Sequence, residues 1–195
     1  PGRPSALLRL PVDRAFSMRG FGTVVTGTLV SGTLSEGDEV CLYPAGRRCR
    51  VRGLQVHGVS VTGAHAGQRT AVNLGGIDVG EIERGHVMGR PGQMSASSLI
   101  DVKLRLLPGE PAPLNDLARV RFHQGTSELL ARVRLLDAAL SELSPGGECF
   151  AQIRLEKQGM SLPNDRFVIR RYSPTITNGG GVVLDAHPGK HKGMT

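Results

Sequence analysis

The sequence predicts an all-β protein built from short antiparallel strands, and two observations support this fold class. Glycine supplies 27 and proline 12 of the 195 residues. Because glycine makes up only about 7% of average proteins, this content indicates a chain that turns often. Apolar and charged residues alternate in many short segments, which places them on opposite faces of half-buried strands. We therefore expect two consecutive antiparallel β-barrels, since closure removes exposed strand edges.

The predicted strands and turns follow one another along the whole chain. Alternation is clearest at 8–10, 51–52, 100–106, 118–123, 131–135 and 152–155. Turn signals rich in Gly, Pro, Asn and Asp separate such segments at 31–32, 36–38, 45–46, 75–76, 144–147, 164–165 and 178–181. No segment with helical character is longer than 135–143. The polar segment 90–98 divides the chain, so we predict domains at 1–93 and 97–187 and a flexible basic tail at 188–195.

The charge balance favours anionic partners. The net charge is +7 and only four of the 24 basic residues are lysines. The planar guanidinium group of arginine suits phosphates. A coding bias towards arginine would give the same excess of arginine over lysine, so both interpretations stay open. No apolar run approaches the roughly 18 residues of a membrane span, so we expect a cytoplasmic protein without a membrane partner. The first residue is not Met, which favours a piece of a longer protein.

The motifs of several enzyme and metal classes are absent from the sequence. No Gly-rich loop ends in Gly-Lys-Ser/Thr, so we expect no nucleotide hydrolysis, no enzyme activity and no cofactor in this chain. Pro188 and Gly189 separate His187 from His191 and rule out a helix that would align both imidazoles on a metal. The three cysteines have no zinc-like spacing, so we expect reduced thiols and no metal.

The first half of the chain resembles domain two of the elongation factor Tu class of translational GTPases. The resemblance lies in the motifs at 10–17, 20–28, 36–38, 66–69, 73–74 and 83–87. Elongation factor Tu carries two acidic residues before its Val-Phe-Ser, whereas this chain has Asp13-Arg14 before Ala15-Phe16-Ser17 and is similar here to the selenocysteine-specific factors. The second half, through 120–123, 131–133 and 165–170, is similar to domain three of those factors.

The resemblance implies a fold, a binding site and a set of partners. It covers roughly residues 6–186 and implies elongation-factor domain II and domain III barrels, without the GTPase domain or the C-terminal winged helices. GTP and Mg²⁺ would belong to that absent GTPase domain. The implied partners are selenocysteyl-tRNA, the factor's own GTPase and winged-helix domains, and the ribosome through the full-length factor. The implied pocket for the aminoacyl end contains Asp13, Arg14, Phe16, Thr26, Arg84 and His86.

The charges of this implied pocket suit selenocysteine. A selenol is largely an anion at neutral pH, whereas the serine carried by the precursor form of the same tRNA is neutral, so Arg14 and Arg84 would favour selenocysteine by charge. Each residue also has a simpler interpretation. Arg14 fits a solvated strand, Arg84 fits a surface ion network with Glu81 and Glu83, and Phe16 fits a core position.

The second barrel has outward-facing basic residues that suit an RNA backbone. The expected backbone contacts are Arg119, Arg121, Arg132 and Arg134. If their strands are neighbours, these residues form a cationic stripe that reads A-form RNA by phosphate and shape. A solvated strand face has the same pattern. Two other functions stay open at this point: the equivalent fragment of another translational GTPase, such as a general elongation factor or an initiation-factor subunit, and an interaction scaffold that binds no RNA.

Overall fold

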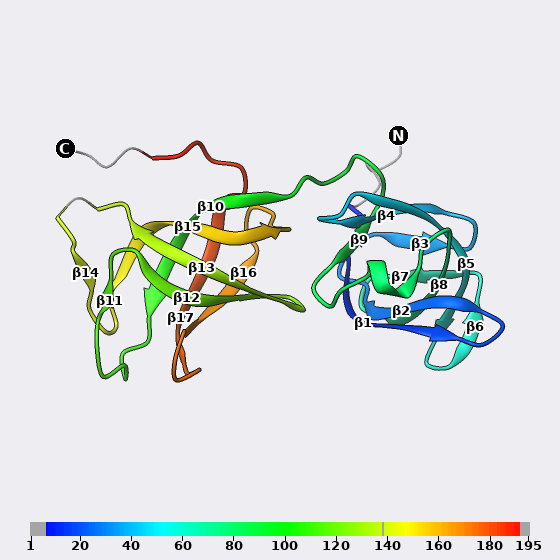
Figure 1. Ribbon diagram of the computed structural model, residues 1–195, viewed down its shortest axis with the longest axis horizontal. Helices are drawn as coiled ribbons and strands as arrows, with labels where there is room; N and C mark the ends of the chain where they lie inside the picture. The colour runs from blue at the N-terminus through cyan, green and yellow to red at the C-terminus, as the bar shows by residue number, and fades with distance from the viewer. Residues whose placement is uncertain (1–6, 138, 192–195) are drawn as a thin grey trace. The chain divides into compact units, whose positions relative to one another are not determined.

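The computed structural model describes residues 7–137 and 139–191, and these form two compact units that divide between Ser95 and Ala96. Both units are closed antiparallel β-barrels (Figure 1). In the described residues no helix is long and apolar enough to cross a membrane. The all-β fold class predicted from the alternation is confirmed, with two six-stranded barrels.

The first barrel contains six strands in the closed order β4-β9-β1-β2-β8-β5, with β5 pairing back to β4 and with β6 added at β5. A separate ribbon pairs β3 with β7, and one 3₁₀ turn, η1, precedes β9. The elements are β1 Leu10–Met18, β2 Gly22–Thr28, β3 Thr33–Ser35, β4 Glu39–Tyr43, β5 Arg47–Val56, β6 Val59–Val61, β7 Gly63–His65, β8 Arg69–Gly75, η1 Val79–Glu81 and β9 Val87–Gly89.

The second barrel closes in the order β10-β15-β13-β12-β16-β17, with β17 pairing back to β10. A two-stranded ribbon joins β11 to β14. The strands are β10 Ser97–Leu106, β11 Leu114–Asn115, β12 Ala118–Gln124, β13 Ser127–Leu135, β14 Glu142–Leu143, β15 Glu148–Gly159, β16 Arg166–Arg171 and β17 Thr177–Asp185. The described residues of the segment 135–143 therefore contain the end of β13 and all of β14, and no helix.

Each barrel is filled by the inward side chains of its alternating strands. In β10, Val102 and Leu104 are fully buried, whereas Lys103 and Arg105 between and after them are exposed. The rings of Phe122 and Phe167 stack in the second core with centroids 5.0 Å apart. Burial of each large apolar side chain contributes about 1.5–3 kcal/mol, so these alternating residues supply most of the stability of each barrel.

The run Asn178-Gly179-Gly180-Gly181 is strand, and its interpretation as a turn was wrong. It lies within β17, between β10 and β16. A Cβ atom at Gly181 would overlap the carbonyl oxygen of Lys103, and one at Gly180 would lie 2.6 Å from the carbonyl oxygen of Phe167. Glycine is needed here because the neighbouring backbones approach closely, and not because the chain reverses.

The last described residues lie against the second barrel. The side-chain amide of Gln152 donates to the carbonyl oxygen of Gly189 at 3.0 Å, and His191 Nε2 lies 2.6 Å from Asp101 Oδ2. Residues 192–195 of the predicted tail lie outside the described residues.

Candidate functional site

Asp13 is held at an irregularity in β1. The register between β1 and β2 shifts between Val12 and Arg14. Thr26 Oγ1 donates to Asp13 Oδ1 at 2.6 Å, and Arg69 Nη1 donates to Oδ2 at 2.5 Å. Partial burial raises the pKa of Asp13, but the hydrogen bonds from Thr26 and Arg69 and the charges of Arg69 and Arg14 outweigh it, so the pKa lies below its usual value. Asp13 is therefore an anion at neutral pH.

Arg14 and Phe16 lie on the outward face of the same strand. Arg14 is exposed and stands opposite Thr26 in the register, while Phe16 stands opposite Val24. Residues directly opposite in an antiparallel pair share a face, so Arg14, Phe16, Val24 and Thr26 form one outward patch.

The turn at 83–86 attaches to β1 beside Asp13. The backbone N–H of Val12 donates to the carbonyl oxygen of His86 at 2.8 Å, and the N–H of Gly85 donates to the carbonyl oxygen of Val12 at 3.1 Å. Arg84 is exposed within this turn. Burial lowers the pKa of His86 and outweighs the opposing charge of Glu83, so its imidazole is neutral at pH 7. The structure thus brings the turn with Arg84 and His86 next to the strand segment with Asp13 and Arg14.

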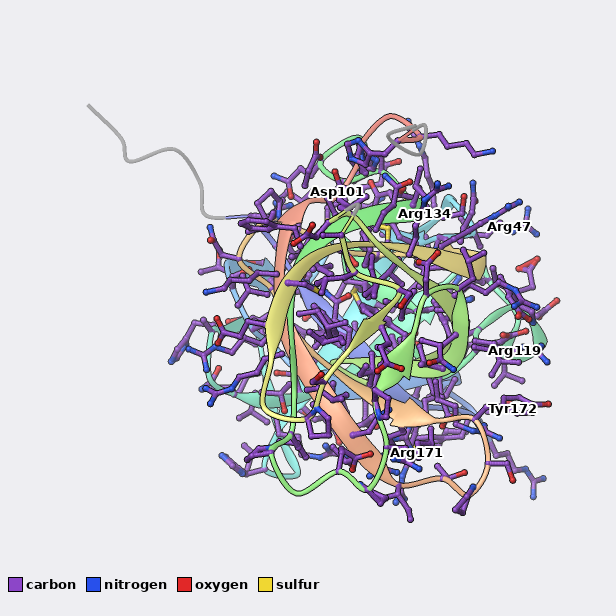
Figure 2. The ribbon with its side chains drawn as sticks, turned by 90° about the vertical axis from the view of Figure 1, so that its left-hand side faces the viewer. Arg47, Asp101, Arg119, Arg134, Arg171 and Tyr172 are labelled. Carbon is purple, nitrogen blue, oxygen red and sulfur yellow. The ribbon has the colours of Figure 1, made fainter. Side chains whose placement is uncertain are left out.

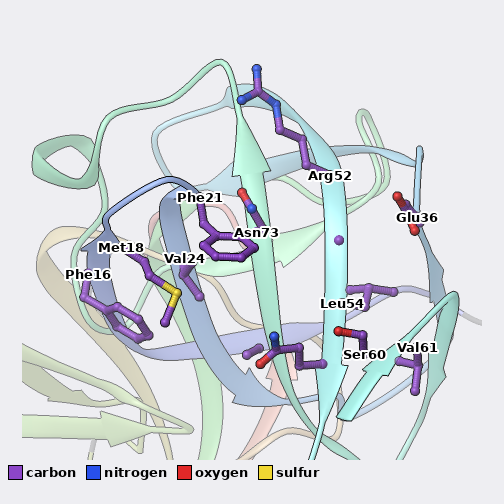
Figure 3. Close-up of a pocket in the computed structure, with 13 residues that line it drawn as sticks. Phe16, Met18, Phe21, Val24, Glu36, Arg52, Leu54, Ser60, Val61 and Asn73 are labelled. Carbon is purple, nitrogen blue, oxygen red and sulfur yellow. The ribbon is translucent and has the colours of Figure 1, made fainter. Parts of the chain in front are cut away.

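A pocket of about 290 Å³ continues this outward face. Figure 3 shows the rings of Phe16 and Phe21 on one side of the pocket and Leu54, Ser60 and Val61 on the other. Phe16 is 38%, Met18 45% and Phe21 56% exposed, so the apolar wall faces solvent. Large apolar groups in a hollow of this size suit a flat organic ring.

Polar side chains from β5 and β8 also line this pocket. Asn73 lines the pocket from β8, and its Oδ1 is buried and has no hydrogen-bond partner among the described residues. Arg52 and Gln55 add polar groups to the lining from β5. A buried amide oxygen without a donor is costly, and a rotation of the Asn73 side chain towards the pocket would let an N–H group of a ligand reach it.

Sequence reasoning found only Phe16 among the residues that line this pocket. The missed residues with side chains suited to a ligand are Met18, Phe21, Arg52, Gln55 and Asn73. Their positions follow from cross-strand register, in which Phe16 pairs with Val24 and Val24 with Asn73. The available signal was the pair of Phe16, near the end of β1, and Phe21, in the turn that follows it.

Two of the four arginines predicted to contact RNA in the second barrel are tied to carboxylates. Arg119 donates two hydrogen bonds to Glu156, at 2.7 and 2.8 Å, and Arg121 donates one to Glu128 at 2.6 Å. Both guanidinium groups also lie over the ring of Tyr172, at 4.7 and 5.6 Å from its centroid. Figure 2 shows Arg119 near Tyr172 and Arg134 apart from both.

The other two arginines, Arg132 and Arg134, are not part of these pairs. Arg132 Nη1 donates to the carbonyl oxygen of Leu117 at 3.3 Å. Both side chains line a second depression, on the outer surface of β13 and β15. Across residues 7–137 and 139–191, no group of three or more His, Cys, Asp or Glu is arranged to hold a metal ion.

Comparison with known families and structures gives matches in both halves. Residues 22–89 match elongation factor Tu domain 2, and residues 101–190 match the β-barrel domain of the selenocysteine-specific elongation factor. The selenocysteine-specific elongation factor of Desulfomicrobium baculatum is 44% identical over 95% of this chain, and that of Escherichia coli is 31% identical over 94%. The chain spans 29% and 28% of the lengths of these two relatives.

A solved structure supports the same assignment. The apo form of translation elongation factor SelB from Methanococcus maripaludis is similar with a TM-score of 0.78 and 26% identity, over 93% of this chain and 43% of that one. The family matched by residues 101–190 is a β-barrel domain, and residues 22–89 belong to the first closed barrel of this chain. Together with the two closed barrels, these matches show that the chain belongs to the SelB-type elongation factors, of which it contains the domain 2 barrel and the following β-barrel domain.

Proposed function

We propose that this chain is the tRNA-binding part of a factor that delivers selenocysteyl-tRNA to the ribosome. The first barrel receives the aminoacyl end of the tRNA, and the second barrel contacts its backbone. The observation that carries the proposal is the outward face of β1. Arg14 lies on this face two residues before Phe16, which lines the apolar pocket. We assign GTP and Mg²⁺ to a part of the factor outside these two barrels, because the chain has no Gly-Lys-Ser/Thr phosphate loop.

The pocket suits the terminal adenosine of the tRNA. Phe16, Met18 and Phe21 offer an apolar wall for a base, and base stacking on such side chains contributes about 1–3 kcal/mol. With its side chain turned into the pocket, Asn73 would offer Oδ1 to an exocyclic amino group, such as that of adenine. An adenine in the pocket would leave the amino acid close to Arg14, because residues two apart on a strand lie about 7 Å apart.

The charged groups beside the pocket suit the selenocysteyl group. Arg14 and the turn with Arg84 offer cations to the selenolate, and a charge-assisted hydrogen bond contributes about 1.5–3 kcal/mol. This free energy corresponds to about 10-fold to 150-fold discrimination against neutral serine per contact. Asp13 is already bonded to Thr26 and Arg69, so its ionised carboxylate is a fixed negative charge beside Arg14 that suits the α-ammonium group.

The test compares two aminoacyl-tRNAs on the full-length factor with GTP. We expect Arg14→Ala and Arg84→Ala each to reduce the preference for selenocysteyl-tRNA over seryl-tRNA by about 10-fold or more, with little change in affinity for seryl-tRNA. Arg48→Ala is the matched control, because Arg48 is an exposed arginine of the same barrel, paired with Glu39 at 3.4 Å. Unchanged discrimination in both pocket variants would refute the assignment. Equal affinity of the unaltered factor for many aminoacyl-tRNAs would instead favour a general elongation factor.

A further inference from the structure

The depression on the second barrel has four cationic side chains around it. Its volume is about 390 Å³, and it lies on strands β13 and β15 and the described end of the chain. The cationic residues that line it are Arg132, Arg134, Arg154 and Lys190. The sequence pattern pointed to the first two of these residues only.

The strand register concentrates this charge. Arg154 on β15 stands directly opposite Arg132 on β13, which in turn stands opposite Arg119 on β12. Side chains in such a row have Cβ atoms about 4.5–5.5 Å apart, and like charges there are destabilising. Three neighbouring arginines in one row therefore need anions around them.

Carboxylates of the protein supply only part of this compensation. Glu156 accepts two hydrogen bonds from Arg119, and its negative charge also attracts the guanidinium group of Arg132. Within the ranges 7–137 and 139–191, no carboxylate forms an ion pair with Arg134, Arg154 or Lys190. The depression thus has a surplus of positive charge, whereas Arg119 at the end of the row is matched.

The described end of the chain completes the depression. Gln152 is 3% exposed and stands opposite both Arg134 and Asp101 in the register. Its amide donates to Asp101 Oδ1 at 2.8 Å and to the carbonyl oxygen of Gly189 at 3.0 Å. Asp101 Oδ2 lies 2.6 Å from His191 Nε2, so both oxygens of this carboxylate already have hydrogen-bond partners. Figure 2 shows Asp101 and Arg134 at the same end of the second barrel.

We propose that Arg132, Arg134, Arg154 and Lys190 form a discrete phosphate site that binds the backbone of an RNA strand. The proposal rests on the proposed RNA-binding function of the second barrel and assigns it to this depression. The guanidinium group of arginine is planar and suits phosphate oxygens. Cations that form no ion pair with a carboxylate of the described residues gain more from a phosphate than Arg119 or Arg121, each of which already has one. The site reads no base, so its affinity is independent of RNA sequence.

The test measures binding of a blunt A-form RNA duplex, without an amino acid, to the whole chain by fluorescence anisotropy. We expect Arg134→Ala/Arg154→Ala to weaken binding about 10-fold at roughly 100 mM salt and to lower the slope of log K against log salt by about two. The matched control is Arg105→Ala/Arg166→Ala, which removes the same charge from exposed positions of the same barrel and should change affinity by less than about 2-fold.

A second measurement separates binding from folding. Inorganic pyrophosphate should raise the Tm of the unaltered chain and of the control but not that of Arg134→Ala/Arg154→Ala, whose own Tm at low salt should equal or exceed that of the unaltered chain because repulsion is relieved. An unchanged RNA affinity and salt slope in this double variant would overturn the site. Because the duplex has no aminoacyl end, this outcome is independent of the first-barrel pocket, whose failure would show only in the discrimination between aminoacyl-tRNAs.

Discussion

Replacement of Asp13 by Asn should destabilise the first barrel at neutral pH. The change removes the negative charge that Arg69 and Arg14 face and replaces one acceptor oxygen by an amide nitrogen. The single oxygen of Asn accepts from Thr26 or from Arg69 but not from both, so one hydrogen bond of about 1 kcal/mol is lost. The ion pair with Arg69 contributes less than about 1 kcal/mol, because the Arg69 side chain is 55% exposed and water screens the charge.

These contributions sum to about 1–2 kcal/mol, which corresponds to a fall of roughly 4–16 °C in the Tm of a barrel of this size. The effect depends on pH with a definite sign. The pKa of Asp13 is lowered in the folded state, so its stabilisation is present above the unfolded value of about 3.9 and is lost as pH falls through the folded pKa. The Tm difference between Asp13→Asn and the unaltered chain should therefore be largest near neutral pH and vanish in strong acid.

Scanning calorimetry on a double-mutant cycle measures this interaction directly. The cycle combines Asp13→Asn with Arg69→Ala, and we expect a coupling free energy of about 0.5–1 kcal/mol. Thr26→Val should be destabilising alone but add little to Asp13→Asn. Strictly additive effects in both pairs, or a Tm difference that persists in acid, would refute the reasoning.

Two further predictions concern single residues. Gly181→Ala should destabilise the second barrel by about 1–3 kcal/mol, because its Cβ would overlap the Lys103 carbonyl oxygen; chemical denaturation checks this, with Gly109→Ala, where a Cβ meets nothing within 4 Å, as control. Burial lowers the pKa of His86 in the folded state, so the unaltered chain should lose stability relative to His86→Gln as pH falls below about 6.5. Parallel pH dependences of Tm in these two proteins would contradict the second prediction.

The fold was predictable because alternation reports burial directly. The strand around Val102 and Leu104 has charged residues between its apolar ones, and this pattern has one simple interpretation. The glycine run in β17 gave the wrong result because glycine serves both turns and close backbone contacts, and only the neighbouring strands distinguish the two.

The site was only partly predictable, since pockets and ion pairs depend on register. Arg121 and Arg134 look equivalent in the sequence, yet Arg121 has Glu128 as its partner and Arg134 lines a depression. Asn73 lies on a strand 57 positions after Phe16 in the numbering, and only pairing through β2 brings both to one pocket. These positions stay predictions as tRNA contacts, and the experiments above address them.

The closure of the second barrel has a consequence for the order of folding during synthesis. One edge of β10, which begins at Ser97, pairs with β15, but its other edge stays unpaired until β17, which ends at Asp185, has been made. Contacts between residues so far apart in sequence form slowly, because a long loop loses entropy before they form. The first barrel is complete at β9 and is free to fold while the remainder is being translated. A chain that ends before residue 177 therefore has two unpaired strand edges, on β10 and β16, where other strands could add.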